Sequence, residues 1–444
     1  MYYNIFMSKR FRDPIHGFIE VSDDELKIID TIEFQRMRNI KQLATTYLIY
    51  HGAEHSRFGH SLGMMHLVTR AFNSALDNYK KQNKKDLFDN DTRQVYLQIL
   101  RLIALLHDIG HAPFSHACED AFEKGIVHED FTREIILNTG IRELINNIGE
   151  KYKEEYKNCE TIITADLLWL IYGEKDEIAV KSLDYKFQDF KFLKCFTNSD
   201  VDCDKMDYLL RDSHYCGVNY GKYDINRLLS CLSVYTNNEG IKQLALKKSG
   251  LQSLEEFVLA RYFMFIQVYF HKTRRFLDKQ FSMCMKEIFK DNPLKISDLK
   301  DFLNHDDTTV WNKIKEISDS FRPAKNLINR NIYTCVFQSN SFKTDDGLKL
   351  FNAAEKELKD GDISDNDYLL DKVEKYPHHF PTINNYDDES GNGIPILSQN
   401  NEPGNLTSVS PIIKNLTELI IFHRIYVDKS HTKLIKKIKE KYNS

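Results

Sequence analysis

The sequence predicts a mainly α-helical protein with a large helical core and a smaller α+β lobe at its C-terminal end. Apolar residues recur with a spacing near 3.6 in most segments, which is typical of amphipathic helices. Hydrophobic residues make up 42% of the chain, enough for a large core. Few segments have the pattern of strands. We predict a core over residues 1–290 and a lobe over 291–444.

The core is predicted to begin with a turn and a short strand. Pro14 and Gly17 bracket the turn, and residues 18–21 have the pattern of a strand. Ser22 and Glu25 then have capping-box spacing at the start of a helix over 23–43. Apolar periodicity predicts further helices over 61–79, 91–109, 130–138, 162–172, 200–213 and 254–289.

The predicted lobe contains a loop, a strand and a basic helix. Five of the nine prolines lie between Pro377 and Pro411, among many Asn, Gly, Ser and Asp residues, which predicts a flexible loop over 377–411. A strand over 419–427 and an amphipathic helix over 429–442 follow. Six lysines of this helix fit a solvated face against a small sheet, and a nucleic-acid-binding arm is the alternative.

Composition excludes several classes of protein. Sixty-one basic and 65 acidic residues give a net charge of -4, and no run of 18 apolar residues predicts a membrane span. The N-terminus lacks the pattern of a secretory signal. Eight cysteines without a CxxC pair favour neither a disulfide framework nor a cysteine zinc site. We therefore expect a cytoplasmic protein that does not bind a membrane.

Histidine is concentrated in one part of the chain. Eight of the 16 histidines fall within 78 residues, with carboxylates between them. Histidine is the commonest metal ligand and the natural acid or base at neutral pH, so this cluster predicts a site. Its members are His51, His55, His60, His66, His107, His111, His116 and His128.

The segment LLHDIGHAPFSH lies at the centre of the cluster. A buried helix is expected to end at His107 and Asp108, which present a nitrogen and an oxygen ligand side by side. His111, four residues after His107, is expected on the same helical face. Gly110 and Pro113 then break the helix and let His116 return toward the site. Candidates for two further ligands are His60 in HSRFGHS and Asp204 in DVDCDKMDYLLRD.

The order of these motifs resembles the HD superfamily of metal-dependent phosphohydrolases. One branch of this superfamily has the same motifs in the same order. They are FRDPIHGFIEV, IIDTIEFQRMRNIKQL, HSRFGHSLG, LLHDIGHAPFSH, the His128–Glu129 pair and DVDCDKMDYLLRD. That branch contains the SAM/HD-domain deoxynucleoside triphosphate triphosphohydrolases and their bacterial dGTPase-like relatives. The resemblance covers residues 9–285, and no SAM domain is expected before it, as in the bacterial members.

The resemblance implies a metal centre and a reaction. It implies one divalent cation and allows a second, and the nitrogen and oxygen donors fit Mn, Fe, Zn, Co or Mg without selecting among them. Water would attack the α-phosphorus of a dNTP and release a deoxynucleoside and triphosphate. The implied metal ligands are His60, His107, Asp108 and Asp204; the implied catalytic residues are Arg57, His111, His116, His128 and Glu129. His116 would protonate the leaving 5′-oxygen, oriented by Glu119 or Asp120.

The resemblance also implies binding residues. Asp204, Tyr208 and Asp212 are spaced to share one helical face. Arg261 and Tyr269 are eight residues apart and are expected on the same side of the long helix, although a buried aromatic ring and a surface arginine explain this spacing nearly as well. The implied substrate contacts are Gln42, Leu43, Lys205, Tyr208, Asp212, Arg261 and Tyr269. A GTP or dGTP activator between the subunits of a homo-oligomer, dimer or tetramer, would contact Lys9, Asp30, Gln35 and Arg38. An ordinary solvated helix face explains the last three equally.

Two other functions stay open. The same chemistry suits a phosphodiesterase or nuclease acting on single-stranded nucleic acid or cyclic nucleotides, although the net charge of -4 makes nucleic acid a secondary partner. A non-catalytic nucleotide sensor is the third interpretation. A triphosphohydrolase uses the whole predicted set of residues and is preferred.

Overall fold

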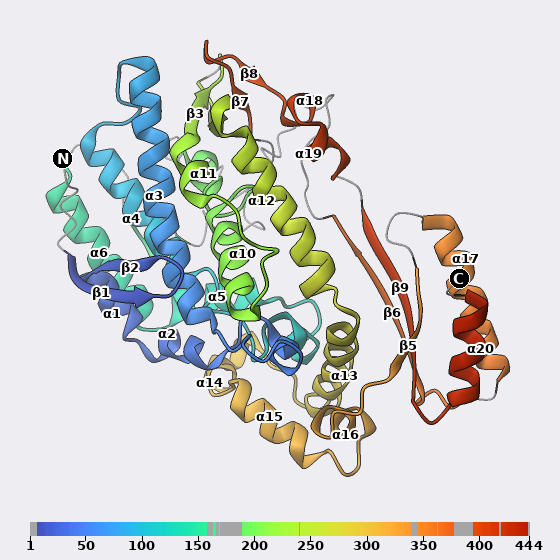
Figure 1. Ribbon diagram of the computed structural model, residues 1–444. Helices are drawn as coiled ribbons and strands as arrows, with labels where there is room; N and C mark the ends of the chain where they lie inside the picture. Colours follow the sequence, from blue (N-terminus) through green and yellow to red (C-terminus); the bar gives the residue numbers. More distant parts are fainter. Residues whose placement is uncertain are drawn as a thin grey trace.

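The computed structural model describes residues 7–157, 163–165, 168, 189–238, 240–339, 344–361, 363–376, 394–416 and 419–442. The protein is mainly helical with a smaller α+β lobe, which confirms the predicted fold class (Figure 1). None of the helices in these ranges combines the length and apolar character that a membrane crossing requires.

The N-terminal segment is a two-stranded ribbon followed by short helices. Strand β1 (Met7–Asp13) pairs antiparallel with β2 (Gly17–Ser22), and the predicted capping box forms at α1 (Asp23–Ile29). The prediction of one helix over 23–43 is wrong. The Thr31 hydroxyl accepts from the Phe34 amide and starts a new helix, α2 (Ile32–Arg36), and the backbone at Ile40 is extended.

The centre of the core is built from three helices. Helix α3 (Arg57–Asn83) packs along α4 (Asn90–Leu106) and is crossed by α10 (Cys203–Cys216). Most of the predicted helix over 162–172 lies outside the described residues. Around the centre lie α5 (His128–Asn138), α6 (Ile141–Glu155), α9 (Phe190–Lys194), α11 (Ile225–Cys231), β3 (Leu232–Thr236) and β4 (Lys242–Lys247).

The helix predicted over 254–289 is two helices. Helix α12 (Leu251–Met264) runs into a π-helical turn at Phe265–Tyr269, and α13 (Lys272–Ile288) begins after it. A π-turn shifts the side chains that follow it, so the eight-residue spacing of Arg261 and Tyr269 does not put them on one regular face. Next come α14 (Leu299–Leu303), α15 (Asp307–Glu316) and α16 (Arg322–Ile328), whose apolar residues join the main core.

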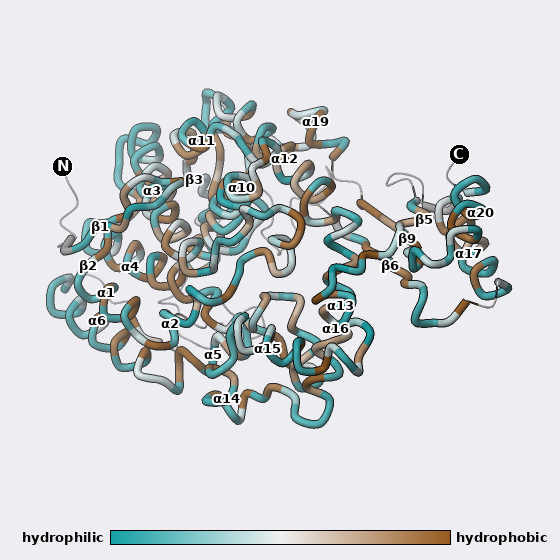
Figure 2. Tube along the Cα trace, turned by 60° about the horizontal axis from the view of Figure 1, so that its bottom comes forward, coloured by the Kyte–Doolittle hydropathy of each residue, from teal (hydrophilic) through white to brown (hydrophobic). Residues whose placement is uncertain are grey.

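The C-terminal lobe is a three-stranded antiparallel sheet covered by two helices. The strands lie in the order β5 (Thr334–Gln338), β9 (Ile420–Val427) and β6 (Tyr368–Lys375). Helices α17 (Thr344–Asp360) and α20 (Thr432–Tyr442) pack on it around a smaller apolar core. Figures 1 and 2 show this lobe projecting from the side of the molecule opposite α4 and α6. The predicted strand over 419–427 and helix over 429–442 are confirmed.

Residues 394–411, the described part of the loop predicted over 377–411, contain short regular elements, and the flexibility of the loop stays a prediction. Strand β7 (Ile396–Leu397) pairs with β4 and with β8 (Pro403–Gly404), and α18 (Leu406–Val409) and α19 (Pro411–Asn415) follow. The apolar side chains Ile394 and Ile396 are buried and hold this segment on the core. The proposed boundary at residue 290 stays a prediction.

Candidate active site and metal centre

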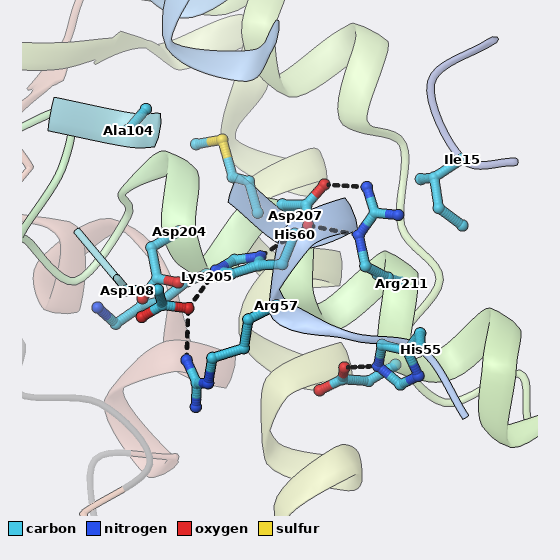
Figure 3. A network of polar contacts seen from close by, with 12 residues as sticks. Ile15, His55, Arg57, His60, Ala104, Asp108, Asp204, Lys205, Asp207 and Arg211 are labelled. Carbon is cyan, nitrogen blue, oxygen red and sulfur yellow. Dashed lines mark hydrogen bonds and ion pairs between the residues drawn. The ribbon is translucent and has the colours of Figure 1, made fainter. Parts of the chain in front are cut away.

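Four predicted metal ligands meet at one point of the helical core. His60 comes from α3, His107 and Asp108 from the end of α4, and Asp204 from the first turn of α10. The His60 Nε2 atom lies 2.9 Å from Asp204 Oδ1, 3.3 Å from His107 Nε2 and 3.7 Å from Asp108 Oδ2. Figure 3 shows Asp108 and Asp204 together on one side of His60. His60, His107 and Asp108 offer donor atoms that all lie within 4.8 Å of one another, and Asp204 joins this group through His60 and, at 3.9 Å, through His107.

Hydrogen bonds fix the orientation of both histidine rings. His107 Nδ1 donates to the Ala104 carbonyl at 2.8 Å, and His60 Nδ1 donates to Asp207 Oδ2 at 2.8 Å. Each bond leaves the Nε2 atom directed at the centre, as a metal-binding imidazole requires. Burial opposes a charge on His60, but the hydrogen bonds to Asp204 and Asp207 raise the pKa of His60 to about 10. A bound cation would replace the Nε2 proton.

The donor set fits a divalent cation. The closest donor pairs are 2.9 to 3.9 Å apart, distances that suit groups bound to one ion with metal–ligand bonds of about 2.0–2.2 Å. Mixed imidazole and carboxylate donors suit several divalent metals and do not identify one. His60, His107, Asp108 and Asp204 are therefore the residues that would hold the ion.

Asp207 is a buried carboxylate behind the site that receives hydrogen bonds from three side chains. Besides His60, it accepts from His16 Nε2 at 2.6 Å and from Arg211 Nε at 2.8 Å. Arg211 also donates to Asp13 at 2.9 Å. Asp207 thus pairs with Arg211 and also orients His60, a contact that the sequence did not reveal. Burial acts to raise the pKa of Asp207, but Arg211, His16 and His60 hold it well below its usual range.

The close packing of this network requires a glycine on α3. A Cβ atom at Gly63 would lie 2.0 Å from Asp207 Oδ1 and 2.3 Å from an Arg211 nitrogen. The second glycine of HSRFGHSLG is therefore needed for the approach of α10 to α3.

We expect Asp207→Asn to weaken metal binding by about 10- to 100-fold, the usual effect of removing a partner behind a metal-binding histidine. The amide keeps the shape of the carboxylate but loses its charge, so it orients His60 less firmly. The dissociation constant of Mn²⁺, measured by competition with a chelator, checks this. Equal affinity in wild type and variant would show that Asp207 is only a structural ion-pair partner.

Arg57 and Asp108 form a buried ion pair beside the centre. Arg57 donates to Asp108 through NH1 and to the Ser115 hydroxyl through Nε at 2.8 Å. Burial acts to raise the pKa of Asp108, but the Arg57 guanidinium, with His107 and His111, holds it well below its usual range. Asp108 is therefore a carboxylate ready to bind a cation, and Arg57 is 4% exposed at the edge of the site.

Three histidines and one glutamate form a second cluster next to this centre. The rings of His111 and His128 stack with centroids 3.9 Å apart, and His116 lies across both. Glu119 accepts from His116 Nδ1 at 2.8 Å and from His128 Nδ1 at 2.9 Å, and Glu129 lies 3.3 Å from His128. Glu119 is therefore the residue that orients His116. Asp120 instead bonds Ser282 and Lys286.

The route by which His111 reaches the site differs from the predicted one. Helix α4 ends at Leu106, so His111 does not share a helical face with His107. A turn after the helix places His111 Nε2 3.3 Å from Asp108 Oδ1. Burial, with Arg57 and His128, holds the pKa of His111 well below its usual range, so its imidazole is neutral. Burial acts to raise the pKa of Glu119, but His116 and His128 lower it to about 2.

The predicted substrate residues on α10 and α12 lie along one side of the site. Asp212 accepts from the Tyr269 hydroxyl at 2.7 Å and bonds His55 Nε2 at 2.8 Å. Lys205 pairs with Asp202 at 2.7 Å, and an Arg261 guanidinium nitrogen lies 3.9 Å from Asp200. His55 was in the histidine cluster but was given no role. Its position five residues before His60 was the only signal in the sequence.

Gln42 lies at the wall of a cavity beside His116, and Leu43 follows it in the chain. Leu43 is buried, and among the described residues the Gln42 side-chain oxygen is buried without a hydrogen-bond partner. A cavity of about 310 Å³ opens there, lined by Gln42, Ser115, His116, Arg274 and Asp278 among others. A buried acceptor without a partner at the wall of a cavity fits contact with a ligand.

The residues implied for an activator lie near the N-terminal ribbon. Arg38 donates to Gln35 Oε1 at 2.7 Å and covers the Phe58 ring, with 3.5 Å between the guanidinium carbon and the ring centroid. Lys9 is exposed on β1, and Asp30 is exposed at the end of α1. The structure therefore joins Gln35 with Arg38, and the role of all four residues stays a prediction.

Comparisons with known proteins match the same region. Residues 57–211 match the HD domain, and residues 223–374 match the HD associated region. An uncharacterized protein of Bacillus subtilis is 29% identical over 442 residues, which cover 95% of this chain and 92% of that protein. The deoxynucleoside triphosphate triphosphohydrolase SAMHD1 homolog of Dictyostelium discoideum is 30% identical over 342 residues, or 74% of this chain and 60% of that protein.

A solved structure supports the fold. The crystal structure of a hypothetical protein from Aquifex aeolicus matches with a TM-score of 0.74 and 29% identity, and the match covers 97% of this chain and 99% of that chain. All four converging metal donors fall inside the region that matches the HD domain. The chain belongs to the HD-domain phosphohydrolase superfamily, with an HD domain followed by an HD associated region.

Proposed function

We propose that this protein is a metal-dependent deoxynucleoside triphosphate triphosphohydrolase that converts a dNTP and water into a deoxynucleoside and triphosphate. The observation that carries the proposal is the arrangement of three neighbouring groups of residues. His111 joins the histidine cluster around Glu119 to the metal donors, with its Nε2 atom 3.3 Å from Asp108 Oδ1, and Asp212, which bonds Tyr269, lies on the same helix as Asp204. The name of the Dictyostelium relative supports the same reaction.

The metal centre and Arg57 would act on the phosphate that is attacked. A divalent cation at this centre supplies positive charge that polarises a phosphate oxygen and activates a water molecule. Arg57 has its guanidinium fixed by Asp108 and Ser115. A planar guanidinium matches phosphate oxygens with two parallel hydrogen bonds. The Arg57 guanidinium would turn from Asp108 toward the substrate when the cation also binds the Asp108 carboxylate.

His116 would supply the proton to the leaving 5′-oxygen. Its side chain is 67% exposed, and its Nδ1 atom is bonded to Glu119, so Nε2 is left for the substrate. Burial acts to raise the pKa of Glu119, but His116 and His128 lower it to about 2, so Glu119 stays an ionised hydrogen-bond acceptor. His128 shares the same carboxylate and fixes its position.

The α10 side of the site would hold the rest of the substrate. Lys205 and Arg261, which lie next to Asp202 and Asp200, would turn toward the triphosphate and supply positive charge. The Tyr269 hydroxyl bonds Asp212, which places an aromatic ring against the carboxylate that would bind the sugar hydroxyl. A ring at this position would collide with a 2′-hydroxyl and favour deoxyribonucleotides.

The nuclease alternative depends mainly on the basic C-terminal helix. Lys437 and Lys441 of α20 both pair with Glu357, at 2.7 and 2.8 Å. Figure 1 shows α20 on the outer side of the lobe, away from α3 and α10. These features favour a solvated helix face, and we therefore prefer the mononucleotide substrate.

A single assay tests the proposal. Mn²⁺-loaded protein is incubated with each dNTP, with each NTP and with a single-stranded oligonucleotide, with and without GTP. We expect deoxynucleoside and triphosphate in equal amounts from dNTPs, little product from NTPs, and intact oligonucleotide. Stimulation by GTP, with a larger particle in light scattering, would support the activator site.

The products decide among the alternatives. Pyrophosphate or inorganic phosphate in place of triphosphate would contradict attack at the α-phosphorus. A cleaved oligonucleotide without dNTP turnover would support the nuclease, and nucleotide binding without any product would support the sensor.

A further inference from the structure

The segment that carries His116 has a strained backbone. Phe114 and Ser115 both have positive φ angles, 56° and 54°, although neither is glycine. A left-handed conformation costs roughly 1–2 kcal/mol for such a residue. Two in succession persist only when surrounding contacts hold them, so the contacts of this segment determine the position of His116.

One buried carboxylate holds this segment together with the one that carries Gln42. Asp307, at the start of α15, accepts from the Phe114 amide at 2.6 Å through Oδ1 and from the Lys41 amide at 2.9 Å through Oδ2. Its side chain is 6% exposed. Phe114 precedes the 3-10 turn of His116, and Lys41 precedes Gln42. One residue of the HD associated region therefore binds the backbone on both sides of the cavity.

Neighbouring bonds join the same three segments. Ser115 donates from its hydroxyl to the Lys41 carbonyl at 2.8 Å and accepts from Arg57. Arg36 donates to the His111 carbonyl and to the His305 carbonyl, each at 2.9 Å. The segment before α15 is thus bound to the turn after His107 as well, and any shift of Asp307 would move the acid–base residues.

We propose that Asp307 is a positioning residue that holds the His116 segment and the Gln42 segment in their active arrangement, and so makes catalysis depend on the docking of the HD associated region. This inference rests on the proposed function for its kinetic consequence. Its structural part, the hold on the Phe114 and Lys41 amides, does not.

The proposal implies a pH dependence with a defined direction. Burial, only partly offset by the two backbone amides, raises the pKa of Asp307 to about 6. Above this pH both oxygens accept hydrogen bonds. Below it, the proton turns one oxygen into a donor and one amide loses its acceptor. The titratable or charged groups around Asp307 are Arg36, Lys41, Tyr47, Cys118 and Asp306.

Asp307→Asn is the test, because the amide keeps the shape but accepts only one of the two bonds. We expect kcat to fall and KM to rise, with kcat/KM for the dNTP lower by roughly 10²-fold at pH 8, the cost of a shift of about 1 Å at a catalytic group. The ratio of wild-type to variant kcat/KM should shrink toward one as the pH falls below about 6. Backbone amides in 38–44 and 111–121 should exchange hydrogen faster in the variant.

Asp306→Asn is the matched control, because Asp306 caps α15 and asparagine is an equally good cap. It should leave kinetics at pH 8, metal content and exchange unchanged, because Asp307 is ionised at that pH with or without the neighbouring charge of Asp306. A fall in kcat with unchanged KM and a lower melting temperature would mean mere loss of folded protein and would overturn the proposal. Unchanged hydrogen exchange of the amides in 38–44 and 111–121 would also overturn it, and so would a wild-type to variant ratio of kcat/KM that does not depend on pH. If the protein hydrolyses no dNTP, the exchange experiment alone still decides whether Asp307 holds these amides.

Discussion

Replacing Asp108 with asparagine should reduce hydrolysis by at least about 10³-fold, since loss of metal polarisation removes several kcal/mol of transition-state stabilisation. Asp108 lies within 3.3 Å of both His107 and His111 and pairs with Arg57. The substitution therefore removes a metal donor and the charge that holds the phosphate-binding arginine. Metal content after dialysis, measured by mass spectrometry, should fall together with kcat.

The same substitution leaves a buried guanidinium without its carboxylate. Removing one partner of a buried ion pair costs about 3–5 kcal/mol, so a lower melting temperature is expected. Asp120→Asn, in the 3-10 helix Ser115–Ala121, provides a control, because Asp120 is exposed and bonds Ser282. It should retain metal and activity. An Asp108→Asn protein that keeps one equivalent of metal and full turnover would refute the assignment of the metal centre.

His116→Ala should lower kcat by about 10²- to 10⁴-fold, the range for loss of a general acid, while metal content stays unchanged. The His116 side chain is 67% exposed, hydrogen-bonds Glu119 and lies edge-on to the rings of His111 and His128, so its removal should change the melting temperature little. Measured kcat, KM and metal content together distinguish this variant from Asp108→Asn, which loses metal.

Glu119→Gln sharpens this prediction. The amide would orient His116 without stabilising its charge, so a smaller loss of kcat is expected than for His116→Ala. The double variant should be no slower than His116→Ala, because Glu119 acts through His116. Additive losses would instead assign Glu119 a separate role, for example through His128, which it also bonds.

The candidate metal ligands could be picked out of the sequence because each lies in a motif with distinctive chemistry. An apolar helix that ends in adjacent nitrogen and oxygen ligands is visible in the sequence as LLHDIGH, and the structure places His107 and Asp108 at that end. The helical core, the strand over 419–427 and the capping box at Ser22 also follow from local periodicity and caps. Local rules suffice where the residue types and their spacing act within one element.

Where helices break was decided by individual contacts. Thr31 starts a new helix within a stretch whose apolar spacing is continuous, and a π-turn interrupts the long helix before Tyr269. The segment after Pro395 has the composition of a loop but carries apolar residues that the core buries. Periodicity measures which side chains face the core, and it does not show which backbone amide a side chain will bond.

The sequence by itself determined the class of chemistry, since histidines and aspartates in this order provide the donors for a cation and an acid–base cluster. Only the tertiary structure decided which residues support them. Asp207 behind His60, Glu119 between two histidines, and Asp307 under the His116 segment are separated from their partners by 147, 9 and 193 residues. A carboxylate can support a histidine or a backbone amide only when it is buried next to that group, and this depends on how the segments of the chain pack.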